Sequence, residues 1–195
     1  MDTQQSYHRD NLKEELIKSG LKLLNDQGYN NFSLRKVAKM CGVSQTAPYR
    51  HFKNKDDLIV SITSEVIKQF EDTLKSAALK YPEDLKNQIN EMGFLYVKFF
   101  VENPEYLQLL FLSKDIKYIQ ENLSSSYTFL PPFETFFNTI QKYCLKNNIV
   151  SDIDIHTFAL SHWSLVHGLA ILISRNDYPY KGDYMELVRK IIWFS

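Results

Sequence analysis

The segment from residue 33 to residue 53 constrains this chain more than any other. It reads SLRKVAKMCGVSQTAPYRHFK. Ser33 suits the N-cap of a short helix, because its hydroxyl can accept a backbone N–H bond. Gly42 follows at a position suited to a positive φ, and Ser44 can cap another short helix that ends near His51. A helix, a glycine-containing turn and a second short helix are typical of a helix-turn-helix unit.

Positive charge is concentrated around the same segment. From Gly28 to Lys55 the chain has six Lys or Arg and no Asp or Glu. Residues 1–55 hold ten basic and five acidic side chains, in a chain whose 23 basic and 23 acidic residues cancel. Phosphate groups attract the first part and repel the remainder, so a nucleic-acid contact should use the N-terminal end. The alternative is the solvated face of a small basic domain.

The rest of the chain is expected to be helical. Val, Ile and Thr never alternate over a sustained stretch, and the 6 Gly and 6 Pro fall mostly at joints between segments. Apolar residues recur every four positions from Leu58 to Ala78, after Asn54 as a cap. This stripe predicts a rigid helix of roughly 25 residues, or roughly 40 Å. Other helices are expected over about 8–27, 33–41, 44–51, 82–100, 104–112, 131–147, 151–175 and 184–192, with a short one after residue 114.

Composition narrows the class of protein. The chain is 44% hydrophobic, enough for a substantial core, yet no run approaches the ~20 apolar residues of a membrane span. The first residues have no apolar stretch, so no signal peptide is expected. Cys41 and Cys144 lie far apart without metal-ligand spacing, which is typical of reduced thiols in a cytoplasmic protein. No metal and no other cofactor is expected.

The helix-turn-helix segment resembles the tetracycline-repressor (TetR) family of bacterial transcription regulators. The resemblance covers residues 12–62, and these residues carry it: Gly28-Tyr29, Phe32-Ser33, Val37-Ala38, Gly42-Val43-Ser44, Tyr49-Arg50-His51-Phe52, Lys55 and Leu58. It implies an all-α fold of about nine helices. Residues 1–54 would form a helix-turn-helix DNA-binding domain. Residues 55–195 would form a helical domain for effector binding and dimerisation, which the long helix joins to the first.

The resemblance also implies a set of DNA contacts. The predicted DNA-binding residues are Ser33, Arg35, Gln45, Thr46, Ala47, Tyr49, Arg50, His51, Lys53 and Lys55. Gln45, Thr46 and Ala47 would face base edges, and glutamine can bond adenine through two hydrogen bonds. Tyr49 and His51 would contact the DNA backbone. Either of these two rings could instead be a packing side chain.

Two residues depart from the usual pattern of the family. Pro48 stands where an ordinary helix former is common, so the direction of Gln45 and Thr46 is in question. Cys41 stands where Ala or Leu is common. It could be a redox sensor, but a small apolar residue in the core of the turn is the favoured interpretation.

A second signal lies near the C-terminal end, where Trp163, His167 and Gly168 resemble the Trp-His-Gly (WHG) class of TetR C-terminal domains. Their helix is apolar almost all round and must be buried on several sides. It would pack on its own chain and, with the last helix, on a second subunit. The predicted dimer residues are Trp163, Val166, Ala170, Ile173, Leu187 and Ile191. The alternative is a helix that is central in a monomer.

A third signal is the number of aromatic residues in the second half. The resemblance implies that this region lines an effector pocket. The predicted effector-binding residues are Met92, Tyr96, Phe99, Phe100, Phe111, Phe133, Phe137, Trp163 and His167. For most of them an ordinary aromatic core is the alternative, and His167 could be a core histidine. Apolar walls with few polar groups suit a small hydrophobic or aromatic effector.

Together these signals predict a cytoplasmic bacterial repressor. Its expected partners are a pseudo-palindromic operator in double-stranded DNA, a second copy of itself, and a small effector that releases the DNA; no membrane is expected. An effector-independent regulator or an activator is the first alternative, and a helical enzyme is the second. The chain has no GxxxxGK, HExxH or GxSxG motif and no Cys/His cluster, which argues against the enzyme.

Overall fold

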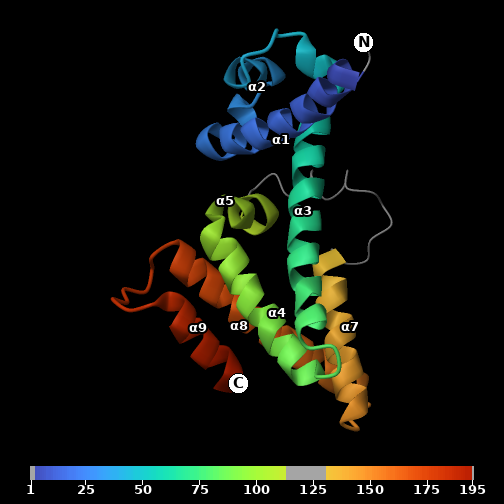
Figure 1. Cartoon of the computed structure of the whole chain (residues 1–195). Helices are drawn as coiled ribbons and strands as arrows, with labels where there is room; N and C mark the ends of the chain where they lie inside the picture. The colour runs from blue at the N-terminus through green and yellow to red at the C-terminus, as the bar shows by residue number, and fades with distance from the viewer. Residues whose placement is uncertain (1–2, 113–130, 195) are drawn as a thin grey trace. The chain divides into compact units, whose positions relative to one another are not determined.

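The structure is a computed structural model that describes residues 3–112 and 131–194, with side chains for 12–112 and 131–193. All regular elements in these ranges are helical, so the predicted all-α fold is confirmed (Figure 1). The short helix expected after residue 114 lies outside the described residues. The elements are α1 (Thr3–Asn31), α2 (Leu34–Met40), η1 (Ala47–Arg50), α3 (Lys55–Lys80), α4 (Leu85–Glu102), α5 (Pro104–Leu107), η2 (Gln108–Leu112), α7 (Pro131–Lys146), α8 (Asp152–Ser174) and α9 (Tyr184–Phe194).

The chain divides into two compact units. The first contains the chain up to Val66 and the short π-helix η2. The second contains Ile67–Leu107 and the helices α7, α8 and α9. The division therefore falls inside α3, which contributes its first half to one hydrophobic core and its second half to the other.

The core of the first unit forms where α1 meets the start of α3. Leu16 of α1 and Leu58 and Ile62 of α3 have no exposed surface. Gly20 permits this packing, because a Cβ atom at that position would lie 2.8 Å from Ile62 Cδ1 and 3.4 Å from Leu58 Cδ2. A larger residue would require the Ile62 and Leu58 side chains to shift in this packed core.

Helix α2 begins and ends as the sequence predicts. The Lys36 backbone N–H donates to Ser33 Oγ at 3.3 Å, so Ser33 is the N-cap. After the helix Gly42 adopts φ 67°, and the Val43 N–H donates to the Ala38 carbonyl at 3.0 Å. The left-handed backbone at Gly42 thus lets the Val43 N–H reach a carbonyl at the end of α2 that has no donor within the helix. Cys41 is half-buried, and its Sγ–H donates to the Glu15 carbonyl at 3.6 Å.

The prediction of a short α-helix from Ser44 to His51 is wrong. Residues 47–50 instead form a 3-10 turn, η1. The Tyr49 N–H donates to the Thr46 carbonyl at 3.2 Å, and the His51 N–H to the Pro48 carbonyl at 2.9 Å. Pro48 has no N–H to donate to the Ser44 carbonyl, so the α-helical pattern is interrupted where it would begin.

Helix α3 matches its prediction closely. It has 26 residues, and Asn54 Oδ1 accepts the Asp57 N–H at 2.9 Å as an N-cap. The predicted stripe is buried from Leu58 through Phe70 to Leu74.

Helix α4 is the centre of the second unit. It packs against α7, α8 and α9 (Figure 1). Tyr96, Val97 and Phe100 on α4 are almost completely buried. Asp84 starts the helix, because its carboxylate accepts the Asn87 N–H at 3.1 Å, and this bond lowers the pKa of Asp84.

The left-handed turn at Gly42 generates a stability prediction. Replacing Gly42 with Ala should lower the free energy of unfolding by about 1 kcal/mol, because an L side chain is disfavoured at positive φ. Gly42→Asn should lower it less, because Asn tolerates this conformation better. Urea unfolding of the two variants measures the difference. Equal losses for Ala and Asn would show that backbone strain at this turn is not the cause.

Candidate nucleic-acid interface

The predicted base-reading residues lie at the tip of the helix-turn-helix segment. Gln45 and Thr46 are exposed, and Ala47 is half-buried. The Ser44 and Thr46 hydroxyl oxygens are 3.2 Å apart, which fixes this turn locally. The tip therefore presents side-chain donors and acceptors to solvent on a short, hydrogen-bonded turn.

The predicted backbone-contacting residues surround this tip. Arg35, Arg50 and Lys53 are exposed, whereas Ser33, His51 and Lys55 are half-buried. Tyr49 is 52% exposed, so its ring is not a packing side chain of the core. His51 lies beside the buried Phe52, with ring centroids 6.3 Å apart.

Within the described part of the chain, the basic residues of the segment form no ion pairs with acidic ones. The ion pairs among the described residues involve none of these six side chains: Arg35, Lys36, Lys39, Arg50, Lys53 and Lys55. Lys36 Nζ donates only to neutral oxygens, Gln27 Oε1 at 2.7 Å and the Asn31 carbonyl at 2.8 Å. The segment therefore keeps its positive charge for an anionic partner.

Lys55 is held by a cluster that the sequence analysis missed. Its ammonium lies 3.9 Å from the centroid of the Tyr29 ring and donates to the Tyr29 carbonyl at 3.4 Å. The Tyr29 hydroxyl in turn donates to Asp56 Oδ1 at 2.8 Å. These contacts tie the end of α1 to the start of α3. The only sequence signal was the Gly28-Tyr29 pair, which does not indicate a partner 27 residues away.

The aromatic residues of the second unit gather around Tyr96. The Tyr96 ring makes edge contacts with Phe70, Phe100 and Trp163, at centroid distances of 5.2, 5.0 and 5.0 Å. Phe133 packs on Trp163 at 4.9 Å. The cluster thus joins α3, α4, α7 and α8 into one network of ring contacts.

Most predicted effector residues belong to this network or lie next to it. Met92 is buried, Phe99 stacks on Phe70 at 5.1 Å, and Phe137 lies 6.1 Å from Phe133. Phe111 is different, because η2 groups with the first unit. The sequence analysis did not predict that Phe70 belongs to this network, because its place in the apolar stripe of α3 indicated only a core residue.

One part-buried hydrogen bond provides a polar pair within the cluster. The Tyr96 hydroxyl lies 2.7 Å from His167 Nδ1. Burial raises the pKa of Tyr96 and lowers the pKa of His167, which favours the neutral form of each group. Tyr96 and the half-buried His167 thus form a hydrogen bond between α4 and α8 whose direction depends on the tautomer of the imidazole.

Helix α8 presents much of its apolar surface outward. By length and composition it is the one helix among the described residues that could cross a membrane, but only 17% of its apolar window is buried. Val166 and Ala170 are buried within their own chain. Trp163 turns toward Tyr96, and Ile173, Leu187 and Ile191 are half-buried. The largest exposed apolar side chains on α8 are Ile153, Leu160 and Leu172.

The Tyr96–His167 bond generates a pH prediction. Because the pKa of His167 is lowered in the folded chain, the unfolded chain binds more protons below about pH 6.5. The free energy of unfolding should therefore fall as the pH drops below this value. The Gln side chain in His167→Gln can still form a hydrogen bond with Tyr96 but does not titrate, so the unfolding of this variant should depend less on pH. Urea unfolding from pH 7.5 to about 5.5 tests this, and equal slopes for both proteins would contradict it.

Comparison with known proteins agrees with this geometry. The model of the family described as "Bacterial regulatory proteins, tetR family" matches residues 16–62. The tetracycline repressor protein class D of Escherichia coli is 32% identical over 83 residues. That match covers 42% of this chain and 37% of the repressor, so the chain spans well under half of this relative's length.

Solved structures share the fold over almost the whole chain. The fatty acid degradation regulator FadR from Bacillus halodurans has a TM-score of 0.69 at 14% identity, covering 93% of both chains. A TetR family transcription regulator from Marinobacter aquaeolei also has a TM-score of 0.69, at 18% identity, covering 96% of this chain and 97% of that one. Residues 16–62 thus match the model of the tetR family of bacterial regulatory proteins, and the described chain has the fold of solved TetR-family regulators.

Proposed function

We propose that this chain is a transcription regulator that binds double-stranded DNA through residues 33–55. One observation carries the proposal. The segment that matches the tetR family is also the one in which six basic side chains have no acidic partner among the described residues. Relatives and solved proteins of the same fold are regulators, which supports this function over an enzyme.

The exposed tip suits the reading of bases. Gln45 and Thr46 present an amide and a hydroxyl, and the amide of glutamine can make two hydrogen bonds to adenine in the major groove. Arg50 and Lys53 are exposed close by in the sequence and suit phosphate oxygens. Because η1 is a 3-10 turn, the tip offers fewer successive residues to the groove than a full recognition helix.

Lys55 is expected to contact phosphate from a fixed position. Its ammonium already lies on the Tyr29 ring and carbonyl, which limits the rotamers that it must give up on binding. A preorganised cation at the start of α3 would set the distance between the DNA backbone and the tip. With DNA contacts assigned up to Lys55, we place the DNA-binding domain at residues 1–54. Residues 55–195 are then the domain for effector binding and dimerisation.

A homodimer is the form that we propose binds DNA. Two copies would read a pseudo-palindromic operator in successive major grooves. The uncovered apolar surface of α8 supports a contact with a second copy, because leaving Leu160 and Leu172 in water costs about 25 cal/mol for each Å². Since Val166 and Ala170 are buried in their own chain, the exposed residues of α8 and the half-buried ones of α9 would carry this contact.

The aromatic cluster is the proposed place of effector action. Tyr96 and His167 offer one polar pair among apolar rings, which suits a small hydrophobic or aromatic molecule with a polar group. Its binding would release the DNA, so the chain would act as a repressor in the cytoplasm. The Trp163, His167 and Gly168 pattern supports the WHG class. Control without an effector, or activation, would leave the DNA-binding residues unchanged.

The DNA contacts can be tested after selection of an operator from random sequences with the purified chain. Tyr49→Ala should weaken binding by about 1 kcal/mol or more, because a backbone contact is lost. Tyr178→Ala is the matched control, since Tyr178 is 55% exposed and Tyr49 is 52% exposed. Gel-shift titration measures both. A Tyr49→Ala protein with unchanged affinity would contradict the assignment of Tyr49, and failure to select any sequence would contradict DNA binding.

The dimer can be tested separately. Leu160→Glu places a charge on the apolar surface of α8 and should convert a dimer into a monomer, because the buried charge would have no partner. Leu79→Glu is the control, because Leu79 is 84% exposed near the end of α3, against 64% for Leu160. Light scattering after gel filtration gives the mass of each protein. A wild-type monomer, or a dimer that Leu160→Glu does not disturb, would exclude this interface.

A further inference from the structure

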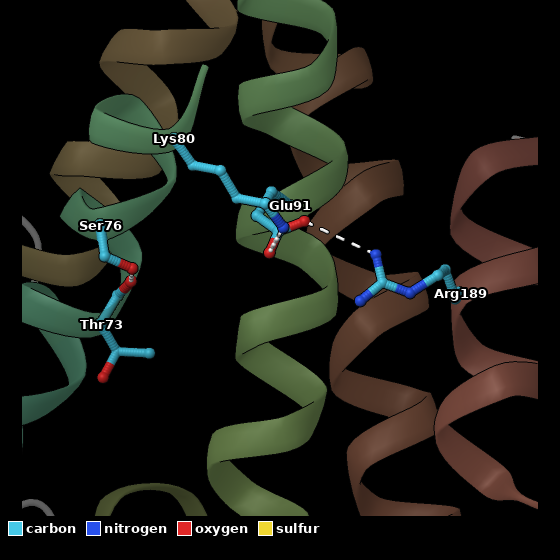
Figure 2. Close-up of polar contacts among 5 residues, drawn as sticks. All are labelled: Thr73, Ser76, Lys80, Glu91 and Arg189. Atoms are coloured by element: carbon cyan, nitrogen blue, oxygen red, sulfur yellow. Dashed lines mark hydrogen bonds and ion pairs between the residues drawn. The ribbon is translucent and has the colours of Figure 1, made fainter. Parts of the chain in front are cut away.

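A buried carboxylate in the second unit lies between two basic side chains. Glu91 on α4 is only 4% exposed. Lys80, the last residue of α3, and Arg189 of α9 reach it from opposite sides (Figure 2). The consecutive helices α3 and α4 and the distant helix α9 therefore share one buried negative charge.

The two oxygens of Glu91 are not equally satisfied. Lys80 Nζ donates to Oε1 at 2.8 Å, and this bond raises the pKa of Lys80. Oε2 is buried and accepts no hydrogen bond from the described residues. Arg189 Nη1 is 3.7 Å from Oε2, too far for a hydrogen bond but close enough for an ion pair.

Arg189 is held in place by aromatic rings. Its guanidinium carbon lies 3.9 Å from the centroid of Phe94 and 5.2 Å from that of Trp193. Phe94 is three residues after Glu91 on α4, so both side chains face α9 from the same side of the helix. This arrangement directs the cation toward Oε2 and keeps it close if the hydrogen bond to Lys80 is lost.

A carboxylate in this position cannot stay charged without a partner, because burial removes its water. Either cation alone can partly compensate for the charge of Glu91. If both cations are removed, the buried carboxylate has no compensating charge and its full desolvation cost remains. Lys80 and Arg189 should therefore depend on each other through Glu91. An exposed ion pair imposes no such dependence, because water can replace the missing partner.

We propose that Glu91 is a positioning residue that fixes the end of α3 relative to α9 through this shared charge. The inference rests on the proposed function in one respect. Helix α3 starts at the predicted DNA-binding segment, and α9 belongs to the predicted dimer surface. A shift of α9 in the dimer would then reach α3 through Glu91, and operator affinity would respond to it.

The exposed pair on α3 provides a matched control. Lys75 Nζ lies 2.6 Å from Glu71 Oε1, a distance similar to that of the Lys80 pair, but the Glu71 side chain is 23% exposed and that of Glu91 is 6% exposed. Lys75→Met should therefore leave operator affinity and the urea midpoint of unfolding nearly unchanged, whereas the network around Glu91 should respond.

The test is a double-mutant cycle of Lys80→Met and Arg189→Met, made in the full chain with Glu91 and repeated with Glu91→Gln. Lost packing of Arg189 on Phe94 cancels, because it occurs in both backgrounds. With Glu91, the double variant should lose at least about fivefold more operator affinity than the product of the single losses. The Glu91→Gln background lacks the buried charge. There, the loss of operator affinity in the double variant should equal the product of the two single losses to within about twofold. Circular dichroism confirms that each variant is folded.

Urea unfolding of the same variants separates the two proposals. If the wild-type chain selects no operator, the proposed function fails, and the non-additive shift of the urea midpoint still decides whether Glu91 couples the two cations. Additive midpoints with Glu91 present would overturn the coupling. A non-additive midpoint with additive operator affinities would show that Glu91 only stabilises the second unit, and it would overturn the positioning role.

Discussion

The buried face of α3 is the constraint on which both compact units depend. Leu58 and Ile62 are fully buried in the first unit, and Phe70 and Leu74 are almost fully buried in the second. Each such side chain contributes about 1.5–3 kcal/mol by leaving water. Both hydrophobic cores include side chains of this one helix, so the position of each of its ends affects one of them. The Tyr29, Lys55 and Asp56 contacts hold its start, and Lys80 holds its last turn through Glu91.

Local patterns in the sequence predicted what local physics decides. The four-residue stripe predicted α3, Ser33 and Asn54 predicted two caps, and Gly42 predicted the left-handed turn. The same reasoning failed at Pro48. The capping signal of Ser44 predicted an α-helix, but the missing N–H of Pro48 leaves only the 3-10 turn η1. Helix α8 was predicted from its composition, but which of its residues face inward depends on α4 and could not be predicted from spacing alone.

The interactions that hold the candidate sites were beyond sequence reasoning because they join distant positions. Tyr29 meets Asp56 across 27 residues, and Tyr96 meets His167 across 71. A lone Glu on a helix, such as Glu91, is normally a solvated residue, and nothing in the sequence indicates that its carboxylate is buried between two cations. The exposed residues of the proposed DNA-binding segment were easier to predict, because their positions follow from a local motif.

The most direct measurement of DNA binding is the salt dependence of affinity for the selected operator. Exposed basic side chains that contact phosphates displace counterions, so affinity should fall with a log–log slope of about −0.9 for each phosphate contacted. With at least about six contacts in a dimer, the loss should be roughly a thousandfold or more between 50 and 200 mM salt. An affinity that stays constant over this range would contradict the role given to Arg50, Lys53 and Lys55.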